Sequence, residues 1–63
     1  MTHAEAMQQA RRRWGEAGRA RHEPESSEFR VGKQIGSVFW VKGVGQSWEE
    51  AFQAADRNAQ NQP

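Results

Sequence analysis

The chain has 63 residues, a formal net charge of +1, three Trp, three Phe, one Ile and no Leu. A chain of this length forms one small domain, and its core must be built mainly from aromatic side chains, valine and alanine. The absence of cysteine excludes disulfides and thiolate metal sites and suits a reducing cytoplasm, where we place the protein. No apolar run is long enough for a signal peptide or a membrane span, so we expect no contact with a membrane.

A first helix is predicted from His3, because Thr2 and Glu5 have the spacing of a capping box. Its outer face is polar and includes Arg12. Gly15 suits the position that follows the last turn, and the arginines at positions 11–13 complement the negative end of the helix dipole. Stabilisation of the helix end and a contact to nucleic acid are compatible roles for this triplet, so Arg12 is a candidate binding residue.

Three short strands are predicted after the helical period fails at Glu16. The first covers residues 18–22 and ends before Pro24, which has no N–H to donate to a central ladder. The second covers residues 29–34, and a turn at positions 36–37 closes a hairpin into the third strand, residues 38–42. Because the third strand is apolar on both sides, periodicity alone does not fix which of its faces is buried.

A glycine-rich joint leads into a second helix. Gly43 and Gly45 allow a positive φ or a close backbone approach, so we expect the chain to leave the third strand here and turn sharply. Ser47 and Glu50 form a second capping box, which predicts that the helix starts at Trp48. The small residues on its apolar face would allow it to lie close to a sheet.

The order helix, three antiparallel strands, helix predicts an α+β fold. Two amphipathic helices on one face of the sheet would cover its apolar side. We expect residues 1–63 to form a single αβββα domain with a polar tail that frays from about position 58. The predicted core has ten members: Met7, Ala10, Trp14, Phe29, Val31, Phe39, Val41, Trp48, Phe52 and Ala55.

The stretch from position 29 to position 55 resembles the double-stranded RNA-binding domain family, which has the same αβββα order. The resemblance rests on a Phe-x-Val pair, a hairpin glycine and the pattern Gly-x-Gly-x-Ser-x-x-x-Ala with two further alanines. The matching positions are Phe29, Val31, Gly43, Gly45, Ser47, Ala51, Ala54 and Ala55. It implies the family's fold, with both helices on one face of the sheet.

The family's RNA contacts are matched less closely than its fold. Directly after the serine, where the family has lysines that grip phosphates, this chain has Trp48 and Glu49. The family's Gly-Pro-x-His loop corresponds at best to Glu-Pro-Glu-Ser at positions 23–26. Carboxylates oppose binding to phosphates. The combination of Arg-Trp-Gly, Val-Gly and Ser-Trp-Glu-Glu-Ala-Phe is also similar to small phage-encoded proteins, a likeness that implies no mechanism.

A basic and aromatic face is predicted on the open side of the sheet. If the resemblance fixes the pleat, odd residues of the second and third strands face the helices and Trp40 faces outward. Four basic residues and no acidic one would share that face with Trp40: Arg19, Arg21, Arg30 and Lys42. An aromatic ring among cations suits stacking on bases with phosphate contacts.

Two alternatives to this binding face remain open. The arginine stems could simply cover Trp40 on an ordinary solvated sheet surface. The opposite pleat would bury Trp40 and expose Phe39 and Val41 instead, because a shift of one residue moves every side chain to the other face.

No catalytic or metal-binding constellation is visible in the sequence. The two imidazoles, His3 and His22, lie far apart in the chain, and a Gly-Val-Gly turn alone is no dinucleotide fingerprint. We therefore predict no enzymatic activity, no cofactor and no small-molecule substrate. The predicted function is a cytoplasmic binding module for nucleic acid, which the basic face favours, or for a protein partner, which the acidic start of the second helix favours.

Overall fold

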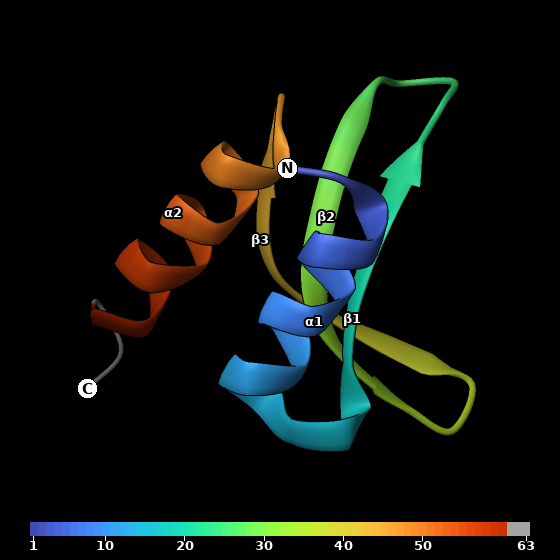
Figure 1. Cartoon of the computed structure of the whole chain (residues 1–63), viewed down its shortest axis with the longest axis vertical. Coiled ribbons are helices and arrows are strands. Elements are labelled where there is room, and N and C mark those ends of the chain that lie inside the picture. Colours follow the sequence, from blue (N-terminus) through green and yellow to red (C-terminus); the bar gives the residue numbers. More distant parts are fainter. Residues whose placement is uncertain (61–63) are drawn as a thin grey trace.

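The structure is a computed structural model that describes residues 1–60. The elements are α1 (His3–Trp14), the 3-10 helix η1 (Gly15–Ala17), β1 (Gly18–Glu23), β2 (Glu28–Ile35), β3 (Val38–Gly45) and α2 (Trp48–Gln60). The strands form an antiparallel sheet in the order β1-β2-β3, with both helices on one side of it (Figure 1). The predicted α+β fold and αβββα order are confirmed.

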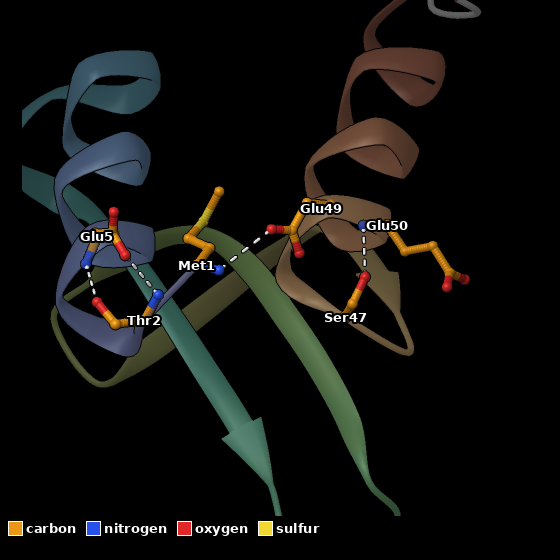
Figure 2. A network of polar contacts seen from close by, with 6 residues as sticks. All are labelled: Met1, Thr2, Glu5, Ser47, Glu49 and Glu50. Atoms are coloured by element: carbon orange, nitrogen blue, oxygen red, sulfur yellow. Dashed lines mark hydrogen bonds and ion pairs between the residues drawn. The ribbon is translucent and has the colours of Figure 1, made fainter.

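The helix starts follow the predicted caps, one fully and one in part. The Thr2 hydroxyl accepts a hydrogen bond from the Glu5 N–H at 3.2 Å, and the Glu5 carboxylate accepts one from the Thr2 N–H at 2.8 Å (Figure 2). At α2 the Ser47 hydroxyl accepts from the Glu50 N–H at 3.1 Å, but the Glu50 carboxylate points away from the cap (Figure 2). The second capping box is therefore formed only in its serine half.

The end of α1 agrees with the residue type found there. Gly15 has the positive φ of 75° that a residue after a last helical turn adopts, and its N–H donates to the Arg11 carbonyl. In α2 the helix continues to Gln60. The rest of the tail that was predicted to fray lies outside the described residues.

The third strand is longer than predicted, because the glycines of the expected turn belong to it. β3 continues to Gly45, and neither Gly43 nor Gly45 has a positive φ. A Cβ at Gly43 would lie 2.1 Å from the Ala51 carbonyl oxygen of α2. Of the two predicted roles of these glycines, close backbone approach is correct and the sharp turn is wrong.

A β-bulge divides the β2–β3 ribbon. Val31 pairs with Gly43, but the next residue of β2, Gly32, pairs with Val41, so Lys42 has no partner of its own. Bulges bend a strand and increase its twist. Beyond this point the ribbon leaves the helices and projects from the body of the domain (Figure 1). We call this projecting part, residues 32–41, the hairpin arm.

The core lies between the helices and the half of the sheet that does not include the hairpin arm. Its fully enclosed members are Ala6, Ala10, Ala20, Val31, Trp48, Ala51, Phe52 and Ala55, and Met7, Trp14 and Phe29 pack against them partly buried. Eight of the ten predicted core residues are among these two groups.

The two predicted core residues that fail are Phe39 and Val41. Val41 is 44% exposed, and Phe39 is half-buried outside the core cluster. Both belong to the hairpin arm, which the bulge turns away from the helices. The expectation of one continuous pleat along the third strand was therefore wrong for its first half.

Candidate functional site

The open face of the sheet, which is the face opposite the helices, carries three of the predicted arginines. Ala20 and Val31 are enclosed in the core, so their neighbours Arg19, Arg21 and Arg30 point to the other side. The aromatic ring on this face is Phe39, with the guanidinium of Arg21 5.5 Å from its centre. The predicted aromatic centre, Trp40, is not among these residues.

The cations of the open face are already engaged. Arg30 forms an ion pair with Glu28 at 3.0 Å, and Glu28 lies opposite Glu23 of β1 on the same face. Arg19 donates to the backbone carbonyls of Glu16 and Gly18 at 2.7 and 2.8 Å. The expectation of a basic face with no acidic residue was wrong, since the strands extend to include both glutamates.

Trp40 lies on the helix side of the sheet but beyond the reach of the helices. It pairs with Lys33, which in turn pairs with Gly18. A Cβ at Gly18 would point at the Ala10 carbonyl oxygen of α1, 2.2 Å away, so this row of residues faces the helix layer. Trp40 is nevertheless 56% exposed. The predicted exposure of its ring is confirmed, whereas the predicted face is wrong.

A groove of about 560 Å³ adjoins the hairpin arm on this side. Its lining is formed by Trp14, Lys33, Val41, Lys42, Ala55, Asn58 and Ala59. The Asn58 amide donates to the Lys42 carbonyl at 2.9 Å, which fastens the bulge to α2. Within the described residues the lining includes two ammonium groups and no carboxylate. We call it the lysine groove.

Arg12 lies apart from both of these surfaces. It is exposed on the outer face of α1, beside Glu5, Gln8 and Gln9. Its neighbour Arg13 has a structural role, because its guanidinium lies 4.8 Å from the centre of the Phe52 ring and pairs with Asp56 of α2. At least one member of the arginine triplet therefore ties the two helices together.

The structure brings both imidazoles to one ring, which the sequence did not indicate. The ring centres of His3 and His22 lie 5.7 and 6.5 Å from the ring centre of Trp48, and the His22 ring stacks on the Phe29 ring with their centres 4.1 Å apart. His3 Nε2 is also 3.0 Å from the Ala20 carbonyl oxygen. In the part of the chain that the structure describes, no three His, Asp or Glu side chains are grouped as a metal site would need.

Lys33 is the site residue that sequence reasoning missed. It occupies an odd position of the second strand, where the predicted pleat would bury it. A lysine at a position assigned to the core is a signal that the core ends before it. The close-packed glycines at positions 32 and 43 mark the same boundary, although neither reveals the bulge by itself.

Comparisons of the chain with protein-family models, curated proteins and solved structures find no match. The topology is compatible with the arrangement of a double-stranded RNA-binding domain. None of the described helices has the length and apolar character that a membrane crossing requires.

Proposed function

We propose that the protein is a non-catalytic cytoplasmic module that binds single-stranded nucleic acid through the hairpin arm and the lysine groove. The observation that carries the proposal is the exposed indole of Trp40, which pairs across the ribbon with Lys33. Lys33 and Lys42 both line the adjoining lysine groove. Bases of any sequence stack on an exposed aromatic ring, and nearby ammonium groups neutralise the flanking phosphates. The open face is less suitable, because Glu23 and Glu28 lie on it.

The size of the site predicts modest affinity. Stacking on one aromatic side chain contributes about 1–3 kcal/mol per base. Each phosphate neutralised on a single strand contributes a slope of about −0.7 to the logarithm of affinity against the logarithm of salt concentration. With two lysines at the site, we expect a slope of about −1.4.

The charges near the start of α2 favour a single strand over the duplex that the family resemblance would imply. Glu49 and Glu50 occupy the first turn of α2, and Glu49 pairs with the amino group of Met1 at 3.4 Å (Figure 2). The turn between β1 and β2 carries Glu25. We propose that the likeness to double-stranded RNA-binding domains is one of architecture and does not extend to the way in which RNA is bound.

The test measures fluorescence anisotropy of a labelled thymidine oligonucleotide of about 16 nucleotides, a length that covers one small binding fold. The double variant Lys33→Gln/Lys42→Gln should weaken binding and flatten the salt slope towards zero. The matched control removes two charges from the open face in Arg19→Gln/Arg21→Gln and should bind as the wild type does. If the control variant loses more affinity than the lysine variant, the site is on the open face and the proposal is wrong.

A protein partner is the second candidate, and the distribution of apolar side chains favours it. Among residues 1–60, six large apolar side chains are exposed, and all except Met1 belong to β2 or β3: Ile35, Val38, Trp40, Val41 and Val44. Exposed apolar patches of this kind often mark protein contacts. Binding to a protein through this surface would respond little to salt, whereas binding to nucleic acid would weaken with the slope of about −1.4 given above.

A further inference from the structure

The two edges of the sheet differ in how they are protected against pairing with another strand. β1 is protected by charged residues at alternate positions, Arg19, Arg21 and Glu23, and by Pro24 directly after it. β3 is the opposite edge. Its first half has none of these devices, since residues 34–41 contain neither a charge nor a proline. An unprotected apolar edge is a template for a further strand.

Three side chains along this edge remain exposed, although each residue pairs with one of β2. Val38, Trp40 and Val41 are 52%, 56% and 44% exposed, and the outer edge of β3 has no neighbouring strand among residues 1–60. Burying a half-exposed Trp removes on the order of 100 Å² from water. With Val38, Phe39 and Val41 added, one copy offers on the order of 300 Å², well below the ~800 Å² per partner of a standard interface. The occupant of this edge is therefore held weakly.

We propose that the edge of β3 pairs with the same edge of a second copy of this chain, in antiparallel orientation. A two-fold antiparallel pair has its axis normal to the sheet, so one residue faces its own counterpart. With Phe39 on the axis, Val38 of each copy faces Trp40 of the other, and apolar side chains meet on both sides. With Trp40 on the axis, Val38 would face the charged Lys42 at the bulge. The first register is the one that we propose.

This pairing goes beyond nucleic-acid binding and does not depend on it. Because the axis is normal to the sheet, the helix layers of the two copies lie on the same side of a six-stranded sheet. The two lysine grooves then face the same direction, which doubles the number of phosphate contacts available to one strand, whereas each Trp40 is partly covered by Val38 of the other copy.

The test is sedimentation equilibrium of nucleic-acid-free protein between about 10 µM and about 1 mM, the range in which weak dimers form. The weight-average mass should rise from 7.2 kDa towards twice that value. Val38→Lys should remain monomeric, because it places a charge within the pairing. The matched control is Val44→Lys, on the same strand but beyond the bulge, which should associate as the wild type does. A wild type that is monomeric at 1 mM, or equal effects of the two variants, would overturn the proposal.

A second measurement uses the wild type alone and so does not depend on the folding of a variant. Amide hydrogen exchange in the first half of β3 should slow as the protein concentration rises, whereas exchange at the outer edge of β1 should not change. Slowing at β1, or at neither edge, would contradict pairing through β3. Because no nucleic acid is present, failure of the proposed ligand would leave this result unaffected.

Discussion

The two halves of the β2–β3 ribbon are built from similar residues but differ in burial. In the half of the ribbon that the helices cover, Val31 is completely buried, and Gly43 lets the backbone of α2 touch the strand. In the hairpin arm, Val38 and Trp40 are more than half exposed. The difference shows that burial in this domain is decided by where the helices reach, and not by the hydrophobicity of the strand.

Two glycines determine where the helices contact the sheet. Cβ atoms at Gly18 and Gly43 would lie 2.2 and 2.1 Å from carbonyl oxygens of α1 and α2, so each helix lies against the backbone of the sheet at one of these positions. Past the bulge at Lys42 neither of the two described α-helices covers the ribbon (Figure 1). Apolar side chains that a domain does not bury itself are available to a ligand or a second copy.

The largest expected effect is in the helix-covered half. Phe52 is 3% exposed, stacks with Trp14 and lies under the guanidinium of Arg13. Phe52→Ala should cost about 3–5 kcal/mol, comparable to the whole stability of a domain this small. We expect a largely unfolded protein by far-ultraviolet circular dichroism and by loss of amide dispersion in NMR. Trp14→Ala should cost less, because Trp14 is only partly buried, and a native-like spectrum of Phe52→Ala would contradict the core.

The next effect tests the contact between β3 and α2. In Gly43→Ala the new Cβ would meet backbone atoms of Ala51 and Ala55, at 2.1 and 2.5 Å, and backbone cannot move aside as a flexible side chain can. Overpacking of this kind costs about 1–3 kcal/mol. The control is Gly36→Ala in the hairpin turn, where there is space for a Cβ but φ is 61°. Urea unfolding should show the larger loss for Gly43→Ala, and the reverse order would place the helix farther from the strand.

A matched pair of valines compares the two halves directly. Val31→Ala should lower the free energy of unfolding by about 2 kcal/mol, since the removed methyl groups are fully enclosed. Val38→Ala should change it by less than about 0.5 kcal/mol, as at other surface positions. Chemical denaturation at a protein concentration of about 1 µM, at which a weak dimer dissociates, measures both values. Equal losses would mean that the arm is packed more tightly than its exposure indicates.

The sequence predicts the body of this domain well because local rules decide it. The capping box at Thr2, the helix end at Gly15 and the hairpin glycine at position 36 each express one local preference. The alanine and aromatic stripe of α2 follows from helical periodicity. Six of the eight predicted core residues that agree lie on the two helices and follow from the same periodicity, and the other two, Phe29 and Val31, follow from the alternation of the second strand.

The candidate site is less predictable because it depends on one extra residue in the ladder. The bulge at Lys42 reverses the pleat of the preceding residues, which moves Trp40 to the helix side and Phe39 to the open face. No local pattern in an apolar strand fixes its register. The meeting of His3 and His22 at Trp48 likewise depends on strand pairing and helix docking, which the spacing of two histidines does not express.

The smallest predicted effect is at the start of α1. Hydrogen bonds from the Thr2 backbone and side chain lower the pKa of Glu5 from its ordinary value. A depressed folded pKa stabilises the fold fully above pH 4.5, the ordinary value, and this contribution is lost as the pH falls through the lower folded pKa. Glu5→Gln should therefore flatten the acid side of the stability curve slightly. Thermal melts between neutral pH and about pH 3 detect this, and an unchanged curve would show that the cap is not formed in solution.

The most direct test of the central claim, that the exposed indole of the arm serves a ligand and not the fold, compares Trp40→Ala with Trp48→Ala. Thermal melts and oligonucleotide anisotropy are measured on both. Trp40→Ala should melt close to the wild type yet bind roughly 5- to 150-fold more weakly, the equivalent of about 1–3 kcal/mol of lost stacking. The Trp48→Ala variant should be unfolded, because Trp48 is only 6% exposed. Destabilisation of Trp40→Ala to the extent of Trp48→Ala, or unchanged binding by a folded Trp40→Ala, would contradict the account.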